Sequence, residues 1–185
     1  MLTKWVKLKP INRIIVVSDA VANDEVQKTL ILSVSPANVK ASAVGVDRMV
    51  RAFHSPRYTD ETAMLLFESP EDILALVQKG VSLTEVNVGG MRFEKDRTQI
   101  TKAVNVSKDH IEAFKQLHDL GVKLELRQLS GDTSVDFYKE LQNHLGSKER
   151  ISVSVIQIIL LLVVAGITGM GSVLDEAQTQ RPLVA

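Results

Sequence analysis

The chain has 185 residues, a formal net charge of zero and a charged fraction of 24%, so its composition gives no electrostatic attraction toward nucleic acid or anionic lipid. Aromatic residues make up only 4%, which argues against a stacking surface for single-stranded nucleic acid. The absence of cysteine excludes disulfides, thiolate catalysis and cysteine-bound metals.

Residues 11–67 alternate short apolar runs with helical patterns. Asn23 is a plausible N-cap for a helix that carries apolar side chains at helical spacing, and residues 46–54 fit a second, short helix. The apolar side chains of the first helix are Val26, Leu30 and Val34. Strands are predicted for the branched, apolar runs 13–17, 39–44 and 63–67.

The next helix carries complete start and stop signals. Ser69 is its expected N-cap, Pro70 takes the first helical position, acidic residues follow in the first turn, and Gly80 ends the helix. Residues 84–88 then predict a strand that leads into a pair of glycines.

Two further helices complete the pattern. Ser107 begins a helix that Gly121 ends, residues 122–126 predict another strand, and a helix around Phe137 stops near Gly146. Strands that alternate with helices of about ten residues indicate crossover units. The fold class is therefore α/β, a mostly parallel sheet with helices on both faces. Residues 102–106 predict one more strand, antiparallel at an edge.

Residues 151–174 carry no charge. A helix of that length spans roughly 36 Å, more than the hydrocarbon core of about 30 Å, so the stretch predicts a transmembrane helix. A buried core helix is the alternative. It is disfavoured because Gly166, Gly169 and Gly171 weaken a soluble helix yet suit close packing in lipid.

Charges flank the apolar stretch unequally. Lys148 and Arg150 precede it, whereas Asp175 and Glu176 follow it. Because positive flanking residues favour the cytoplasmic side, we expect a cytoplasmic domain attached to a membrane. Its predicted boundaries are 1–145 for the domain, 146–150 for a linker and 151–185 for a membrane segment.

Ligands of a parallel sheet gather beyond the carboxyl ends of its strands. The candidate site there includes Asp19, Ser69, Gly89 and Gly90. The glycine pair lets backbone amides approach an anion, although a turn that needs positive φ is the commoner explanation. Asp19 fits an acid, a metal ligand or, most commonly, a loop cap. Neither GxxxxGK[ST] nor GxGxxG occurs, so nucleotide binding has no support in the sequence. No cofactor and no metal are expected.

The four histidines give weak functional signals. His110 and His118 lie eight residues apart on one predicted helix, about 12 Å along its axis, which is too far to share a metal. His54 and His144 lie near predicted helix ends, where solvated imidazoles are common. A structural or surface role is the expectation for each of them.

Several stretches together resemble the IIB component of mannose-family bacterial sugar phosphotransferase systems. The resemblance covers residues 1–145, and its glycine pair is similar to that of the mannose and glucose branch. It is carried by TKWVK (3–7), NRIIVVSDAVANDEVQKTL (12–30), SPRY (55–58), MLLFESPED (64–72), VNVGGM (86–91) and DHIEAFK (109–115). Residues 156–185 resemble the beginning of a IIC membrane component, through GMGSVLDEAQTQRPLVA at 169–185.

This resemblance implies a phosphoryl relay. A phosphohistidine on a IIA partner passes its phosphoryl group to a IIB histidine, which passes it to a hexose of the mannose, glucose or fructose class held by IIC and IID subunits. In the family that histidine lies in an RIDxRLIHGQV-like first strand and loop. Here Met1 and Leu2 stand directly before Thr3, so the expectation is a chain that lacks its first strand and active-site loop.

Two functions follow from the resemblance. One is a IIB phosphocarrier, in which Asp19, Ser69, Gly89 and Gly90 form a phosphate- and partner-binding cradle. The other is a catalytically inactive, membrane-anchored remnant or binding subunit, because no residue here matches the phospho-acceptor. The resemblance implies IIA, IIC and IID as partners; self-association into a homo-oligomer is also considered.

Overall fold

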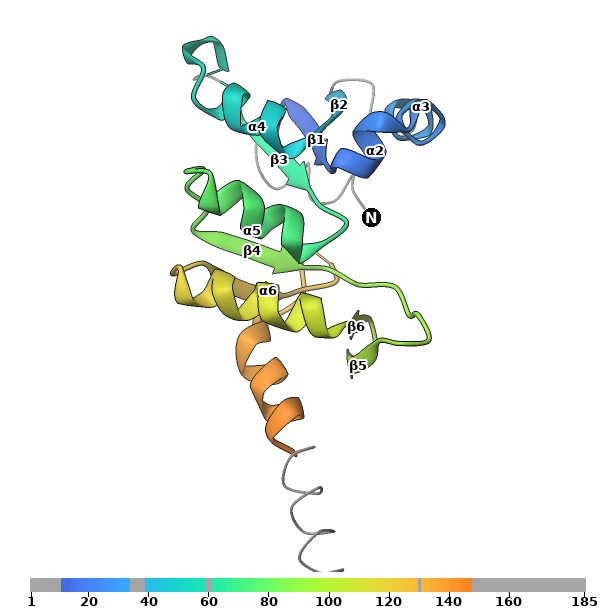
Figure 1. Cartoon of the computed structure of the whole chain (residues 1–185), viewed down its shortest axis with the longest axis vertical. Coiled ribbons are helices and arrows are strands. Elements are labelled where there is room, and N and C mark those ends of the chain that lie inside the picture. The colour runs from blue at the N-terminus through green and yellow to red at the C-terminus, as the bar shows by residue number, and fades with distance from the viewer. Residues whose placement is uncertain (1–10, 34–38, 59–60, 130, 148–185) are drawn as a thin grey trace, which may run out of the picture. The chain divides into compact units, whose positions relative to one another are not determined.

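The computed structural model describes residues 11–33, 39–58, 61–129 and 131–147, and Figure 1 shows their helices and strands. The chain forms two compact units, Met1–Leu141 and Gln142–Ala185. The fold described below belongs to the first unit. In the second unit, residues 142–147 are helical.

Three parallel strands form the N-terminal half-sheet. They are β1 (Arg13–Val17), β2 (Lys40–Val44) and β3 (Ala63–Leu66), in the order β2-β1-β3. Arg13 pairs with Lys40 on one side and with Ala63 on the other. The central strand, β1, is a continuous branched apolar run and is buried from its second residue onward, as expected for a parallel strand covered on both faces.

Short helices connect these strands. After β1 the chain forms α2 (Asp19–Asn23) and α3 (Glu25–Ser33), and α4 (Val46–Phe53) follows β2. A short 3-10 helix, η1 (Pro56–Tyr58), precedes β3. The predicted helices at 46–54 and after residue 23 are therefore present.

The cap of α3 was predicted one residue too early. Asp24, rather than Asn23, accepts hydrogen bonds from the backbone amides of Val26 and Gln27 at 2.9 and 3.0 Å. Val26 and Leu30, predicted as a single helical face, are 70% and 61% exposed. Helical spacing placed them on one face, but that face points to solvent.

The C-terminal half-sheet contains β4 (Glu85–Val88), β7 (Lys123–Leu126) and β8 (Val135–Asp136), in the order β4-β7-β8. The β4 and β7 strands are parallel and β8 is antiparallel. A separate antiparallel pair joins β5 (Thr98–Thr101) to β6 (Val104–Val106). The extra antiparallel strand predicted at 102–106 is thus confirmed as β6, whereas β5 and β8 were not predicted.

Two helices flank this region, α5 (Pro70–Gln78) and α6 (Lys108–Asp119), and they pack against each other. Their predicted ends are confirmed. Ser69 and Ser107 accept hydrogen bonds from the third helical amide of each helix. Gly80 and Gly121 follow the helices with φ of +90° and +83°, the left-handed conformation that favours glycine at a helix end.

One apolar cluster joins β1 to α4, to α5 and to the residue after Gly80. Its buried members are Ile15, Val17, Val46, Met49, Leu76 and Val81. Next to α6, Phe114 and Phe137 are both almost fully buried and meet edge to face, with ring centroids 4.8 Å apart. Each half-sheet is therefore anchored by its own apolar contacts.

The α/β class and the parallel strand pairs confirm the predicted fold, with helices flanking the sheets. Within the residues that the structure describes, no helix is long and apolar enough to cross a membrane. The predicted transmembrane segment at 151–174 and the 148–150 part of the linker lie outside those residues.

Candidate functional site

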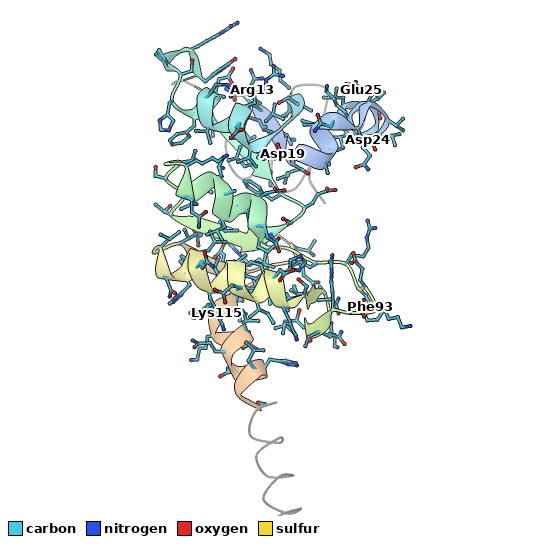
Figure 2. The ribbon with its side chains drawn as sticks, in the orientation of Figure 1. Arg13, Asp19, Asp24, Glu25, Phe93 and Lys115 are labelled. Carbon is cyan, nitrogen blue, oxygen red and sulfur yellow. The ribbon has the colours of Figure 1, made fainter. Side chains whose placement is uncertain are left out.

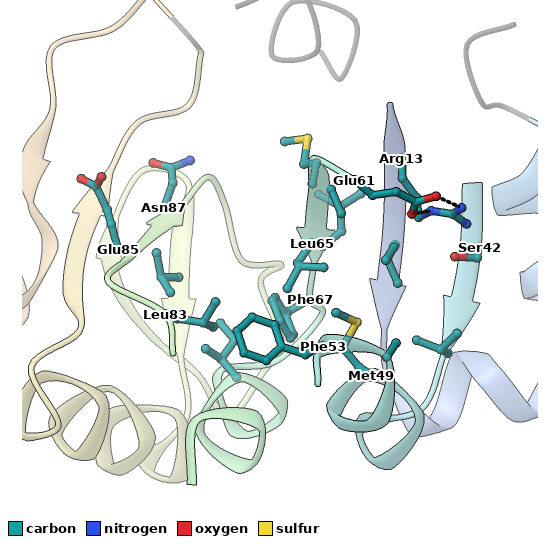
Figure 3. Close-up of a pocket in the computed structure, with 18 of the residues that line it drawn as sticks. Arg13, Ser42, Met49, Phe53, Glu61, Leu65, Phe67, Leu83, Glu85 and Asn87 are labelled. Carbon is teal, nitrogen blue, oxygen red and sulfur yellow. Dashed lines mark hydrogen bonds and ion pairs between the residues drawn. The ribbon is translucent and has the colours of Figure 1, made fainter. Parts of the chain in front are cut away.

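A large cleft lies between the free edges of β3 and β4 (Figure 3), with a volume of about 1140 Å³. Its lining is mostly apolar and comes from the N-terminal half-sheet, from α4 and from β4. The apolar side chains include Ile15, Val44, Met49, Phe53, Leu65, Phe67, Ile73 and Leu83.

One ion pair lies at the side of this cleft where β1 begins. The guanidinium of Arg13 donates to the Glu61 carboxylate, with Nη2 and Oε1 2.6 Å apart (Figure 3). This hydrogen bond lowers the pKa of Glu61 and raises that of Arg13. Both side chains are therefore ionised near neutral pH and compensate each other's charge.

A second, smaller hollow of about 90 Å³ lies beyond the carboxyl ends of β3 and β4. Three of the four predicted site residues, Ser69, Gly89 and Gly90, line it together, and Glu68 and Asn87 join them. The rule that ligands gather beyond parallel strand ends therefore located residues that are also neighbours in space.

Ser69 has a structural role within this hollow. Its Oγ accepts a hydrogen bond from the amide of Asp72 at 3.3 Å and so caps α5. The first turn of that helix is acidic. Burial raises the pKa of Asp72, and the nearby carboxylates of Asp19, Glu71 and Glu68 raise it further. This side of the hollow therefore carries negative potential, opposed by the partial positive charge of the helix N-terminus.

The glycine pair does not owe its presence to positive φ. Among the described residues only Gly80 and Gly121 have positive φ, so the turn explanation predicted for Gly89 and Gly90 is wrong. A Cβ at Gly89 would lie 3.7 Å from the carbonyl oxygen of Arg127, and one at Gly90 would lie 3.5 Å from that of Ala103. These are ordinary contacts, so neither position requires glycine for lack of space.

Asp19 is the first residue of α2, where Figure 2 labels it, and its side chain is exposed. Its Oδ1 accepts a hydrogen bond from the amide of Val46 at 3.1 Å, so it ties the loop after β1 to the start of α4. A Cβ on Gly45 would fall 2.2 Å from that oxygen. The structure thus gives Asp19 the capping role predicted as commonest, and it does not line the small hollow.

None of the three histidines in the first unit lines the cleft or the hollow. His110 is buried; its Nδ1 accepts from the amide of Ser107, and its Nε2 lies 3.7 Å from Glu71 Oε1. His118 is exposed and stacks on Tyr138, with ring centroids 3.8 Å apart. His54 is exposed beside Phe53.

His144 belongs to the second unit. Across the described residues no group of three histidine, cysteine, aspartate or glutamate side chains is placed to hold a metal ion.

Sequence reasoning missed one buried carboxylate, that of Glu125 on β7, whose side chain is only 4% exposed. Burial alone would raise its pKa, but hydrogen bonds from Ser134 and Arg127 lower the pKa of Glu125 to about 2. Lys123 Nζ lies 3.7 Å from the same carboxylate. Three alternating charges, at 123, 125 and 127, were the available signal, because they share one face of the strand.

Comparisons with known proteins identify the family. Residues 1–151 match the protein family described as "PTS system sorbose subfamily IIB component". A "PTS system fructose-specific EIIB component" of Bacillus subtilis is 61% identical over 143 residues, which are 77% of this chain and 88% of that protein. A sorbose-specific EIIB component of Klebsiella pneumoniae is 40% identical over 139 residues, covering 75% and 85%. The mannose-specific EIIAB component of Escherichia coli K12 is 48% identical over 130 residues, only 40% of its length.

Solved structures agree in fold. A protein described as "phosphoenolpyruvate-dependent phosphotransferase system" is 61% identical with a TM-score of 0.75, covering 77% of this chain and 88% of that one. The IIB domain of the sorbose permease of Klebsiella pneumoniae is 39% identical with a TM-score of 0.74, covering 77% and 87%. The chain belongs to the sorbose subfamily of phosphotransferase system IIB components, within the mannose, fructose and sorbose family whose members transfer phosphoryl groups to sugars.

Proposed function

We propose that this chain serves a sugar phosphotransferase system as its sugar-specific IIB component, acting between a phosphorylated IIA domain and the IIC and IID membrane subunits. The proposed cargo is a hexose of the mannose, glucose or fructose class. The observation that carries the proposal is the 61% identity over 143 residues to a fructose-specific EIIB component.

The strand-end hollow supports a phosphate-binding role. Phosphoryl transfer needs donors that hold the oxygens of the transferred group. The amides near Gly89 and Gly90 and the N-terminus of α5 beyond Ser69 surround one small hollow. Glycine backbone amides and a helix N-terminus both favour bound anions, and they act against the negative potential of Glu68, Glu71 and Asp72.

A second candidate function is a binding subunit that does not carry the phosphoryl group itself. It is favoured by the position of the histidines. The relay needs an imidazole nitrogen at the hollow, yet neither His54, His110 nor His118 lines it. His110 is further disfavoured as a nucleophile because its Nδ1 already accepts a backbone hydrogen bond.

Incubation with phosphorylated IIA tests both functions. Acid-labile, base-stable label on the chain would support the phosphocarrier and contradict the second function. Binding of IIA without any label would support the binding subunit. Absence of both IIA binding and label would contradict both functions.

The proposed location is the cytoplasmic face of the inner membrane, held there by residues 151–174. Fractionation of a tagged full chain tests this, since an anchored chain should require detergent for release. Recovery of the intact chain without detergent would oppose the membrane anchor and leave the IIB assignment untouched.

A further inference from the structure

An exposed aromatic side chain lies beside the strand-end hollow. Met91 lines the hollow, and Phe93, two residues later, is 70% exposed, on the loop where Figure 2 labels it. A single exposed apolar side chain is common on protein surfaces. Phe93 differs from such a side chain in how its loop is held and in where that loop lies.

The base of this loop is fixed to the pair of strands β5 and β6. The amide of Met91 donates to the carbonyl of Ala103, with N and O 2.8 Å apart. The carbonyl of Met91 accepts a hydrogen bond from Asn105 Nδ2 at 3.1 Å, and Asn105 is itself buried on β6. The chain therefore leaves the hollow in a fixed direction just before Phe93.

A second set of contacts closes the loop. Arg97 Nη1 donates to the carbonyl of Arg92 with N and O 3.2 Å apart, and Arg97 Nη2 lies 2.8 Å from Glu94 Oε1. These contacts join the residues on both sides of Phe93. The exposed ring therefore belongs to a braced loop.

A second exposed apolar side chain follows the neighbouring strand. The carbonyl of Arg127, directly after β7, accepts a hydrogen bond from Asn87 Nδ2 at 3.1 Å, and Asn87 lines the hollow. Leu129, two residues further along, is exposed, and its amide donates to Asp132 Oδ2 at 2.7 Å. The loops after β4 and β7 thus each present one apolar side chain near the hollow.

The length of chain between Met91 and Phe93 places Phe93 within reach of any protein that docks over the hollow. Consecutive Cα atoms are about 3.8 Å apart, so the Cα atoms of these two residues are separated by at most about 7.6 Å. A standard interface buries about 800 Å² on each partner, which corresponds to a disc with a radius of about 16 Å. A partner centred on the hollow therefore reaches this loop as well.

The charges on the two sides of the hollow differ in sign. Residues 92–97 include three basic and two acidic side chains, whereas residues 68–72, around the start of α5, include three acidic side chains and no basic one. A phosphoryl group brings negative charge to the hollow, but a hexose is neutral. The loop side therefore favours the encounter with the phosphoryl donor, and complementary charges orient that donor.

We propose that Phe93 is an anchor residue of the surface that receives the IIA domain, where its ring enters an apolar pocket of IIA with an acidic rim and Leu129 contacts the edge of the same interface. Buried aromatic anchors carry much of the binding energy in many protein interfaces. The surface serves the donor of the proposed relay, so the inference rests on the proposed function.

Titration calorimetry of the full chain with a mannose-family IIA domain tests the anchor. The IIA domain is unphosphorylated, so that no group is transferred during the measurement. Phe93→Ala should weaken binding at least about tenfold. Leu120→Ala is the matched control, because Leu120 is 54% exposed but ends α6 just before β7 begins, at the opposite end of the strands from the hollow. It should leave binding unchanged.

Charge reversal tests the electrostatic part of the same surface. Lys95→Glu should weaken IIA binding at least about threefold at low salt and should reduce the salt dependence of binding. Lys115→Glu is the control. Both lysines are exposed, and Figure 2 shows Lys115 on α6 well away from the loop of Phe93, so this control should bind IIA as the unchanged chain does.

The possible results separate this surface from the proposed function. If the unchanged chain does not bind IIA, both proposals fail. If it binds and neither Phe93→Ala nor Lys95→Glu weakens binding, the anchor is wrong and the IIB assignment stands. Equal losses in Phe93→Ala and Leu120→Ala would also reject the anchor, because they would report a general effect. Weaker binding of Phe93→Ala to IIC and IID, with IIA binding unchanged, would assign the surface to the membrane subunits instead.

Discussion

The two half-sheets are held by different interactions. The N-terminal one has a central strand, β1, whose buried residues Ile14 to Val17 are all apolar. In the C-terminal one, β7 alternates a buried Leu124 with a buried Glu125. The same parallel pairing thus rests on apolar contacts in one half and partly on a charge network in the other. The stability of the first half should depend less on pH than that of the second, because its Arg13–Glu61 ion pair is more exposed than Glu125.

Removing one large core side chain from each half should have the largest effect. Phe114→Ala removes a buried ring that packs on Phe137, and about 3–5 kcal/mol of stability should be lost. Leu76→Ala, in the cluster that packs on β1, should cost about 2–5 kcal/mol. Denaturant unfolding measures the stability lost in each variant, and amide exchange shows which strands are affected. Phe114→Ala should accelerate exchange first in β7, and Leu76→Ala first in β1; identical patterns would mean one shared core.

Neutralising the buried carboxylate tests the charge network. Glu125→Gln removes the buried anion that accepts hydrogen bonds from Ser134 and Arg127, and we expect a loss of about 1–3 kcal/mol at neutral pH. Thermal unfolding at pH 7 measures it, with the conservative Lys139→Gln on an exposed position as control. An unchanged midpoint for Glu125→Gln would show that the network contributes nothing net.

Lowering the pH should destabilise the C-terminal half-sheet more than the N-terminal one. The folded pKa of Glu125, about 2, lies below its ordinary value of 4.5, so its contribution is present above pH 4.5 and is lost as the pH falls toward 2. Over that range, exchange in β7 should accelerate more than exchange in β1, and Glu125→Gln should reduce the difference. Equal acceleration in both strands would contradict the assignment.

A smaller local change tests the connection between β1 and α4. Gly45→Ala places a methyl group against Asp19 Oδ1, so the carboxylate must move and release the amide of Val46. We expect a loss of about 1–3 kcal/mol, confined to the N-terminal half. Combining it with Asp19→Ala should recover part of that loss, because the methyl group then meets no oxygen. If the double variant is no more stable than Gly45→Ala, the clash with Asp19 is not the cause of the loss.

The smallest expected effect concerns the helix caps. Ser69→Ala and Ser107→Ala each remove a side chain that accepts from a backbone amide, and each should cost about 1 kcal/mol. Ser107 also belongs to a capping box with His110, so its loss should be the larger of the two. Chemical denaturation of both variants ranks them. Because Ser69 also lines the hollow, anion binding should weaken only in Ser69→Ala.

Local signals predicted most of the elements. The branched run of β1, the Ser69 cap and the Gly80 ending are decided within a few residues, and all three are confirmed. The β5 and β8 strands were missed because they are short, polar and stabilised by a partner strand. Whether Val26 and Leu30 face the core depends on what packs there, which helical spacing alone does not specify.

The site was predictable only in part. Strand-end position correctly grouped Ser69, Gly89 and Gly90, because parallel strands end at one edge of a sheet. Glu125 was not recognised, because a charged residue between apolar ones in a strand is normally predicted to face solvent. Its carboxylate accepts a hydrogen bond from Ser134, nine residues further along the chain. No pattern within the strand predicts that contact.

The strand registers also bear on how the chain folds. Arg13 pairs with Lys40, 27 residues later, and Glu85 pairs with Lys123, 38 residues later. Loop-closure entropy grows slowly with length, so these closures differ by only about 0.3 kcal/mol. Neither half must wait for the other, and no described strand pair couples them. Helix α5 packs against both α4 and α6, so the two halves are expected to open separately only when these helix contacts are released.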